Sequence, residues 1–395
     1  MRVLHIIPSI CRKRGGPSKA VIEMVKALRM KSIDASIVTT TDNAPYRESG
    51  LPINEWFFYQ DVPVLMFPCI QWKNKTLDEF LICPRMTKWL FDNAEKYDIL
   101  HIHAIFSYPS TMAMVVARIK RVPYIVRTIG QLDRWSLEQG FIKKRLMLLL
   151  VEKSNLRSAV FIHVTSQQEA DQVFNVVNQS RSILNLALGV EFPTRTSNRL
   201  SSFSAITTNS IRFIFLSRLH PKKQLDILLK AFYHLVHKYG INNWILYIAG
   251  DGSTEYVEKM KQMSKELCLD QNLRWLGHLS GNRKDEILES MDWFVLPSAS
   301  ENFGIAAVES LALGIPVIIT PAVGIADAVK EHGAGLVCEA EADKLASVLK
   351  KAMLGSPHSM RLAAKKLALE KYSWDNISAE LIRYYSLVPS IFKQK

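Results

Sequence analysis

The sequence predicts an α/β protein made of two doubly wound domains, each with a parallel sheet between layers of helices. Short apolar runs alternate with amphipathic helical segments through both halves of the chain, which is typical of parallel sheets. A polar stretch without periodicity separates the two halves. The chain has 395 residues, too many for one ordinary hydrophobic core, so two domains of similar size are expected.

Each half contains its own series of candidate strands. Those of the first half are residues 2–7, 35–40, 98–103, 123–128 and 159–164. Those of the second half are residues 211–217, 244–249, 272–276, 292–297, 315–320 and 335–338. The predicted organisation is an N-terminal domain (1–193), a Ser- and Thr-rich linker (194–210), a C-terminal domain (211–372) and a last helix (373–395) that packs back on the N-terminal domain. Ligands of such folds bind at the carboxyl ends of the strands, so function is expected in a cleft between the two domains.

Composition limits the classes of function. The five cysteines are scattered and form no CxxC, which predicts a reduced, cytosolic protein without a metal cluster. No apolar run approaches the ~18 residues needed to cross a bilayer, and the apolar start precedes its basic residues, unlike a secretory signal. The net charge of +13 favours anionic partners. Nucleic acid is not expected, because Lys and Arg are dispersed and no basic recognition element stands out.

The segment P-S-A-S-E-N-F-G-I-A-A-V-E carries the clearest chemistry. It places Glu301 in a loop, Gly304 at a helix start, and Glu309 about one and a half turns into that helix. Free backbone N–H groups at such a helix start can bind a phosphate. The two carboxylates would repel phosphate, but they can accept hydrogen bonds from sugar or ribose hydroxyls. Phosphate, ribose and sugar together indicate a nucleotide-sugar.

Two cations belong to the same sheet edge. Arg218 leaves the end of the strand at 211–217, and Lys223 follows five residues later. Cleavage of a sugar–diphosphate bond leaves negative charge that cations, a metal or helix N-termini must stabilise. No Asp-x-Asp pair or histidine cluster in the sequence offers a metal site. We therefore expect Arg218, Lys223 and the Gly304 helix start to do this without a metal or other cofactor.

With these segments in view, the chain resembles the retaining group-1 glycosyltransferases (glycosyltransferase family 4) over nearly its whole length. The resemblance lies in S-R-L-H-P-K-K, A-G-D-G-S, L-G-H-L-S and the E-x7-E spacing of E-N-F-G-I-A-A-V-E. It implies the GT-B architecture, with two Rossmann-like domains, and implies sugar transfer from a nucleoside diphosphate to an acceptor hydroxyl with retention of configuration. Acceptors in the family range from lipid-linked glycans and polysaccharides to small molecules.

The resemblance also implies roles for individual residues. Glu301, Arg218 and Lys223 would act at the reacting sugar and diphosphate. Glu309 would hold the ribose, and Leu279 would offer backbone to the base. The donor-binding positions would be Gly16, Leu279, Asn302, Phe303, Gly304, Ile305, Ala306 and Glu309.

The first half adds a Gly-Gly turn and several candidate acceptor contacts. Gly16 opens a helix after the first strand, where backbone can approach a phosphate, although the nicotinamide pattern G-x-G-x-x-G is absent.

Zinc binding by His101 and His103 would need a third ligand that the sequence does not reveal. His101 is expected in the core, and His103 is expected to reach the cleft. The candidate acceptor-side residues are His103, Arg127, Gln131 and Asp133.

Two features leave alternatives open. Many relatives carry a sugar-contacting His where this chain has Ile129, so a nucleotide-sugar-binding protein with altered or lost catalysis and a GT-B epimerase remain rival functions. The segment 141–153 mixes leucines with Lys143, Lys144 and Arg145. Its short polar face favours leucines packed in the core, whereas the alternative is a helix lying on anionic lipid at the inner face of the membrane.

Overall fold

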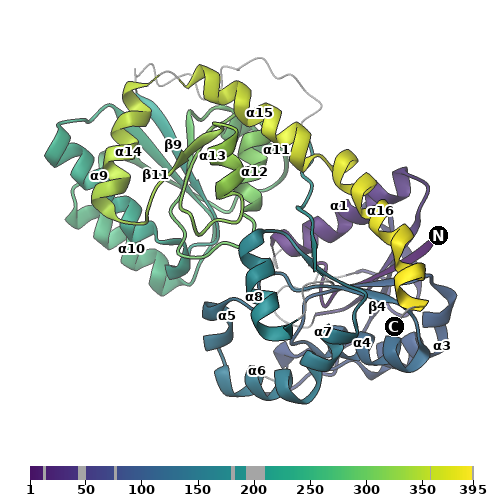
Figure 1. The fold of residues 1–395 in the computed structure, drawn as a ribbon. Helices are drawn as coiled ribbons and strands as arrows, with labels where there is room; N and C mark the ends of the chain where they lie inside the picture. The colour runs from purple at the N-terminus through teal and green to yellow at the C-terminus, as the bar shows by residue number, and fades with distance from the viewer. Residues whose placement is uncertain are drawn as a thin grey trace. The chain divides into compact units, whose positions relative to one another are not determined.

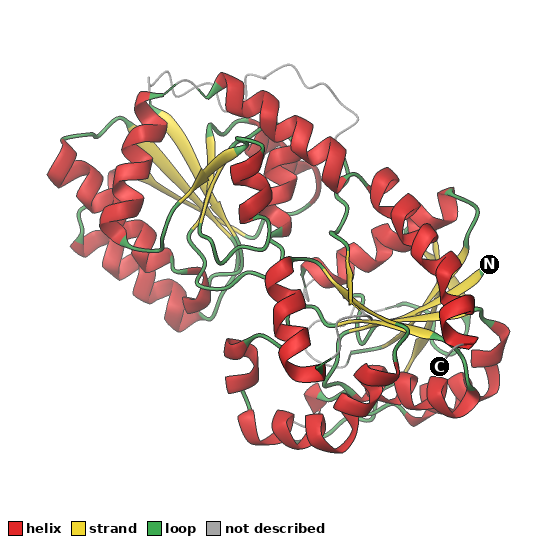
Figure 2. Ribbon diagram, in the orientation of Figure 1, coloured by secondary structure: helices red, strands yellow, loops and turns green. Residues whose placement is uncertain are grey.

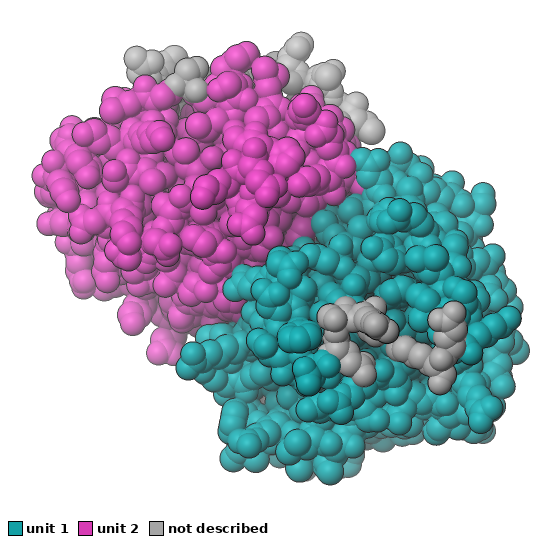
Figure 3. All heavy atoms as spheres, in the orientation of Figure 1, with its two compact units in different colours: residues 1–189, 374–395 teal, residues 190–373 magenta. Residues whose placement is uncertain are grey.

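The structure, a computed structural model, describes residues 1–11, 15–42, 50–74, 78–178, 183–192, 210–355 and 357–393. The chain forms two compact units, shown in teal and magenta in Figure 3. Unit 1 comprises Met1–Gly189 and Trp374–Lys395, and unit 2 comprises Val190–Ser373. The predicted linker at 194–210 lies outside the described residues, apart from Ser210.

Unit 1 is built around an eight-stranded sheet in the order β3-β4-β2-β1-β5-β6-β7-β8, in which only the β3–β4 pair is antiparallel. Helices lie on both faces of the sheet (Figures 1 and 2). Its strands are β1 (Arg2–Ile6), β2 (Asp34–Thr40), β3 (Trp56–Tyr59), β4 (Val62–Phe67), β5 (Ile99–His103), β6 (Tyr124–Arg127), β7 (Phe161–Val164) and β8 (Ile183–Asn185). Its helices are α1 (Gly16–Met30), α3 (Pro84–Asn93), η2 (Ala94–Lys96), α4 (Tyr108–Lys120), α5 (Arg134–Glu138), α6 (Phe141–Met147), η3 (Leu148–Glu152), α7 (Lys153–Ser158), α8 (Gln167–Val177) and α16 (Trp374–Lys393).

The five strands predicted in the first half are present, and three further strands were missed. The hairpin β3–β4 turns at Gln60 and Asp61, which both have positive φ although neither is glycine. The usual Asn-Gly or Asp-Gly hairpin signal is therefore absent from the sequence. β4 also carries Pro63, which argues against a strand when it is read in isolation.

The two faces of this sheet differ in polarity. Alternate residues of a strand point to opposite faces, so Leu4 and Ile6 of β1 face one side and His5 faces the other. The Leu4 side is a conventional apolar core that packs against α3, α4 and α7. The His5 side lies under α16, whose Tyr385 contacts the His101 ring edge-on at a centroid distance of 5.9 Å. One layer of unit 1 is thus apolar and the other is rich in polar side chains.

Unit 2 contains a six-stranded, wholly parallel sheet in the order β11-β10-β9-β12-β13-β14, a doubly wound topology. All six strands predicted in the second half are present. They are β9 (Ile211–Leu216), β10 (Trp244–Ala249), β11 (Leu273–Gly277), β12 (Trp293–Leu296), β13 (Val317–Ile319) and β14 (Gly335–Val337). The helices are η4 (Pro221–Lys223), α9 (Leu225–Tyr239), α10 (Thr254–Glu266), η5 (Asp270–Asn272), α11 (Gly281–Glu289), α12 (Ile305–Ala312), α13 (Ala326–Glu331), α14 (Ala342–Leu354) and α15 (His358–Tyr372).

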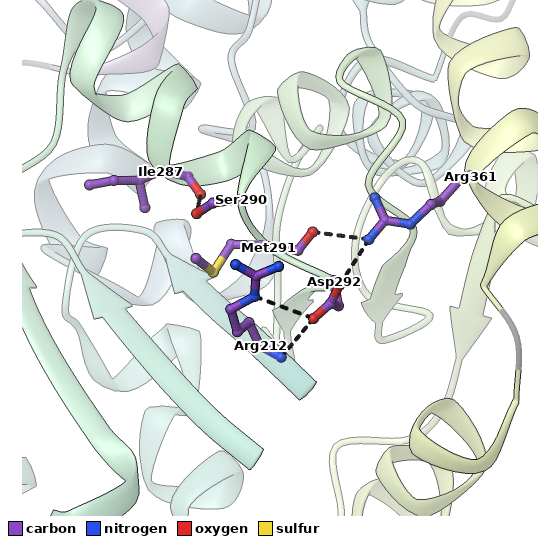
Figure 4. Close-up of polar contacts among 6 residues, drawn as sticks. All are labelled: Arg212, Ile287, Ser290, Met291, Asp292 and Arg361. Atoms are coloured by element: carbon purple, nitrogen blue, oxygen red, sulfur yellow. Dashed lines mark hydrogen bonds and ion pairs between the residues drawn. The ribbon is translucent and has the colours of Figure 1, made fainter. Parts of the chain in front are cut away.

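A carboxylate fixes the amino end of the two central strands of unit 2 (Figure 4). Asp292, just before β12, accepts a hydrogen bond from the backbone N–H of Arg212 at 2.9 Å and donates its own N–H to the Arg212 carbonyl. Its other oxygen accepts from the Arg361 guanidinium at 3.1 Å, which ties α15 to the same point. The register of β9 against β12 is therefore fixed at the edge opposite the strands' carboxyl ends.

The glycines of A-G-D-G-S have a steric role at the carboxyl edge. Gly250 has φ +133, and a Cβ built there would lie 1.8 Å from the Ser217 carbonyl oxygen. A Cβ on Gly252 would lie 2.3 Å from the Leu219 carbonyl oxygen. The loops after β9 and β10 can approach this closely only because both positions lack a side chain. The two glycines thereby set the position of Arg218.

We predict that Gly250→Ala lowers the free energy of unfolding by more than about 2 kcal/mol, because the new methyl group must displace the Ser217 carbonyl. Gly240→Ala is the matched control, since Gly240 also has positive φ (+66) but has nothing within 4 Å of the added Cβ. It should cost about 1 kcal/mol from backbone strain alone. Urea unfolding followed by circular dichroism measures both, and equal costs would contradict the steric explanation.

Candidate active site

Backbone hydrogen bonds join the loops that follow β9, β12 and β13, three neighbouring strands of unit 2. The Ala299 N–H donates to the Lys222 carbonyl at 2.9 Å, linking the first two loops. The Glu301 N–H donates to the Ala322 carbonyl, and the Gly324 N–H donates to the Glu301 carbonyl, both at 2.9 Å. The backbone of Glu301 is therefore held from both sides, which fixes the position from which its side chain projects.

Lys223 and Glu301 meet at this edge, although 78 positions separate them in the chain. The Lys223 ammonium donates to Glu301 Oε2, and the two side chains are only 13% and 22% exposed. Lys223 comes from η4, whose first turn is stabilised by His220 Nδ1 accepting from the Lys222 N–H. Two of the three residues expected to act at the reacting sugar and diphosphate are thus in direct contact.

The surroundings of Lys223 are strongly cationic. Burial, followed by the charges of Lys222 and Arg218, lowers the pKa of Lys223 to about 7, while the Glu301 contact acts against this shift. Burial, followed by Arg218, Lys223 and Lys222, also lowers the pKa of His220. The surroundings of this contact are therefore positive, which suits an anionic ligand.

The start of α12 supplies backbone donors beside these side chains. Gly304 has φ +89 and no side-chain cap, and a Cβ there would lie 2.9 Å from the Val323 side chain. Ala307 and Val308 both donate to the Gly304 carbonyl, so Ile305 precedes the first intrahelical hydrogen bonds. A helix of this kind favours negative charge at its N-terminus.

Glu309 has a partner that the sequence did not indicate. Lys284 of α11 lies 2.6 Å from Glu309 Oε1, and both side chains are only 12% exposed. A carboxylate has about four lone-pair sites, so Glu309 can hold the lysine and also accept from a hydroxyl. In the sequence, Lys284 stands in a charged helical stretch and looks like any surface lysine, so only the fold reveals the pair.

The other predicted donor residues have mixed environments. The Phe303 side chain is buried and packs edge-on against Tyr372, with ring centroids 5.6 Å apart, so only its backbone can serve a ligand. Leu279 is buried, and it lies in the loop that joins β11 to α11. Asn302 is half-buried in the loop beside Glu301. Gly16 is the first residue of α1 in unit 1, after Gly15 with φ +85.

The expectation that the His103 side chain reaches the cleft is wrong. His103 is fully buried, and its Nε2 lies 3.0 Å from His5 Nδ1. The prediction for His101 is confirmed, because it is buried and its Nδ1 is 2.7 Å from the Tyr385 hydroxyl. The error arose because α16 covers this face of the sheet, and its sequence lies nearly 300 residues away.

His5 is the third histidine that the sequence did not reveal. Nitrogens of His5, His101 and His103 lie within 4.8 Å of one another, a grouping that could hold a metal ion. However, nitrogens of all three rings already take part in hydrogen bonds. His5 Nδ1 and His103 Nε2 bond to each other at 3.0 Å, and His101 Nδ1 bonds to the Tyr385 hydroxyl at 2.7 Å, so an ion would have to displace these bonds.

Electrostatics also disfavours a cation there. Burial, followed by His163 and Arg127, lowers the pKa of His5 to about 3. Burial also lowers the pKa of Arg127, to about 10, which leaves this guanidinium charged at neutral pH. A divalent ion would add to that buried positive charge. The histidines fit a neutral hydrogen-bonded network better than a metal centre.

The other acceptor-side candidates have structural contacts, and an acceptor role for them stays a prediction. Arg127 is only 2% exposed. Gln131 Oε1 accepts from the Ile105 N–H at 2.6 Å, which fixes the loop after β5. Asp133 is buried and caps α5 by accepting from the Ser136 N–H at 2.6 Å.

Ile129, at the position where the family resemblance implies a His, lies on a strained loop. Its φ is +53, an unfavourable conformation for a β-branched residue. Glu169 of α8 holds the loop, because Glu169 Oε1 accepts from the Thr128 hydroxyl at 2.6 Å and from the Gly130 N–H at 2.7 Å. Glu169 was not among the predicted site residues, although S-Q-Q-E at the start of α8 has the spacing of a capping box.

Family comparisons agree with this geometry. Residues 197–367 match the family described as glycosyl transferases group 1, and residues 15–183 match the glycosyl transferase 4-like domain. The chain is 25% identical over 313 residues to an uncharacterized glycosyltransferase of Methanocaldococcus jannaschii, covering 74% of this chain and 76% of that protein.

Two further similarities span nearly the whole chain. The GDP-mannose:cellobiosyl-diphosphopolyprenol alpha-mannosyltransferase of Komagataeibacter xylinus is 22% identical over 405 residues, which covers 98% of this chain and 93% of that protein. The Anabaena protein HepE, solved with UDP and glucose, superposes with a TM-score of 0.74 at 18% identity, covering 98% of this chain and 99% of that one. This structural likeness shows the GT-B fold. The chain is a glycosyltransferase that belongs to the group 1 family, whose members transfer sugars from nucleotide-sugars.

Proposed function

We propose that this enzyme transfers a sugar from a nucleoside-diphosphate sugar to an acceptor hydroxyl with retention of anomeric configuration, in the synthesis of a cell-surface polysaccharide or glycolipid. The contact between Lys223 and Glu301 beside the start of α12 carries the proposal. It puts a cation for the leaving diphosphate next to a carboxylate for sugar hydroxyls. The K. xylinus relative, named for a diphosphopolyprenol acceptor, supports a lipid-linked glycan as the acceptor.

The chemistry assigned to this edge is mainly electrostatic. Arg218, Lys223 and the N–H groups of Ile305 and Ala306 would stabilise charge as the diphosphate leaves. Glu301 would align the sugar through its hydroxyls, and Glu309 would hold the ribose. The acceptor hydroxyl would attack on the face from which the diphosphate departs, and a donor phosphate oxygen would take its proton.

We further propose that the reaction needs no metal ion and that the enzyme works in the cytoplasm, at the inner face of the membrane when its acceptor is lipid-linked. The positive charge that a divalent cation would bring to the diphosphate is already present as Arg218, Lys222 and Lys223. Turnover that survives chelation with EDTA is the expected result, and turnover that stops until a metal is restored would contradict it.

The central test combines stereochemistry with mutation. A thermal-shift screen of nucleotide-sugars first identifies the donor, because a ligand of the folded state raises the melting temperature. Transfer to lipid-linked acceptors is then followed by nucleotide release and by NMR of the product anomer. We expect an unchanged anomeric configuration, and a loss of about 100-fold or more in kcat/KM in Arg218→Ala and in Lys223→Ala.

Lys230→Ala is the matched control, because Lys230 is an exposed lysine of the adjacent helix α9. It should leave transfer unchanged. An inverted product would overturn the retaining mechanism, and normal rates in both site variants would overturn the site.

A second candidate function is a nucleotide-sugar-binding protein with altered catalysis. The strained, apolar Ile129 in place of a sugar-contacting His is the observation that favours it. Donor binding with neither transfer nor hydrolysis, across all acceptors tried, would support this alternative. Rearrangement of the donor sugar without an acceptor would instead indicate an epimerase.

Lys284 is predicted to position Glu309 for the ribose. Glu309→Ala should weaken nucleoside-diphosphate binding by about tenfold or more, because a charged hydrogen-bond acceptor is lost. Lys284→Ala should weaken it by a similar factor, and the double variant should be no worse than either single one. Calorimetry measures all three, with Arg283→Ala, an exposed neighbour on α11, as control. Tighter binding in Lys284→Ala would show that Lys284 competes with the ribose instead.

Donor affinity should depend on pH through Lys223. The ammonium is present below its pKa of about 7 and is lost above it, so affinity for an intact nucleotide-sugar should fall from pH 7 to pH 9 by up to about tenfold per pH unit. The intact donor is the right probe because its diphosphate does not titrate in this range. Lys223→Arg keeps its charge and should flatten the profile. A wild-type affinity that stays constant over this range would contradict the assignment.

A further inference from the structure

The helix that runs from α6 through η3 into α7 exposes a continuous row of large apolar side chains. Ile142, Leu146, Leu149 and Leu150 are 80%, 54%, 71% and 73% exposed. Their spacing of i, i+4, i+7 and i+8 puts them on one side of the helix, and we call them the apolar stripe. The interpretation that the leucines of this segment pack in the core is therefore wrong for these positions.

The other side of the same helix already anchors it to unit 1. Leu148 packs against the apolar core, and Leu156 is fully buried. Glu152 is also fully buried, where it accepts from the Thr111 hydroxyl and from the Phe106 N–H. In Figure 1, α5 and α6 lie at the lower margin of unit 1. The stripe is thus additional to what folding requires, and a contiguous exposed apolar surface of this kind marks a binding surface.

Charge on either side of the stripe indicates the partner. Lys143 and Arg145 are exposed and flank the stripe, and the Arg145 guanidinium lies 5.6 Å from the Phe141 ring centroid. The acidic member of this segment, Glu152, is buried and cannot oppose them. Lys144 is turned inward, toward the Ser136 carbonyl. A row of apolar side chains bordered by basic residues complements a partner that has an apolar interior and a negatively charged surface layer.

We propose that the apolar stripe is a docking surface for an anionic lipid bilayer, with Lys143 and Arg145 at the level of the lipid phosphates. None of the helices that the structure describes has the length and hydropathy needed to pass through a bilayer, so the helix would lie in the interfacial plane. The proposal concerns a surface of unit 1 and does not depend on the donor chemistry of unit 2. It would bring the enzyme to lipid-linked acceptors.

Vesicle binding tests the proposal directly. The full-length protein is sedimented with vesicles of phosphatidylcholine alone or of phosphatidylcholine with phosphatidylglycerol, at low and high salt. We expect binding to the anionic vesicles that weakens with salt and is much weaker on the neutral ones. Leu149→Ser/Leu150→Ser should reduce the partition coefficient about tenfold or more. Lys143→Gln/Arg145→Gln should reduce it about tenfold on anionic vesicles only.

Leu354→Ser/Leu362→Ser is the matched control, because these leucines of unit 2 are 74% and 62% exposed and the change removes a similar apolar surface. It should bind vesicles like the wild type, and thermal melting should show all variants folded. The proposal would be contradicted if the wild-type protein did not bind anionic vesicles. It would also be contradicted if the control variant bound them as weakly as Leu149→Ser/Leu150→Ser. The wild type could instead form a dimer, bind no vesicles, and become monomeric when it carries Leu149→Ser/Leu150→Ser. This result would show that the stripe is an interface between two copies of the chain.

Discussion

Backbone hydrogen bonds at the carboxyl edge of the unit 2 sheet position the residues of the proposed active site. They join the loops after β9, β12 and β13 at Lys222, Ala299 and Glu301. With these loops fixed, Lys223 and Glu301 meet, and part of the entropy cost of ordering the two side chains is met during folding. The proposed site is therefore organised without a bound donor, which suits electrostatic stabilisation of a leaving group.

Unit 1 is organised by a different constraint, the burial of polar side chains under α16. Four histidines and Arg127 lie on one sheet face, and burial keeps the histidines neutral at physiological pH. Buried polar groups cost free energy unless they are hydrogen-bonded. Tyr385 satisfies His101, and the Leu186 carbonyl satisfies His163 at 2.9 Å. The last helix, α16, is thus needed to complete the core of unit 1, whose first strand lies at the other end of the chain.

Local motifs predicted most of the fold. Every predicted strand is present, since buried parallel strands are continuous apolar runs that need no partner to be recognised. The hairpin β3–β4 was missed because Gln60 and Asp61 adopt positive φ against their ordinary preference, which only tertiary packing can impose. Lys284 was missed because its significance depends wholly on its distance from Glu309.

The sequence by itself determined the α/β class and the family, and it predicted a donor-side role for the motif from Glu301 to Glu309, because these depend on residues close together in the chain. Only the tertiary structure decided that His103 is buried, that Glu301 is held by Lys223, and that the leucines around Leu149 face solvent. The helical period shows which side chains share a face, but not which face the rest of the protein covers. Whether a helix face is buried depends on contacts between residues that are distant in sequence, and these contacts exist only in the folded chain.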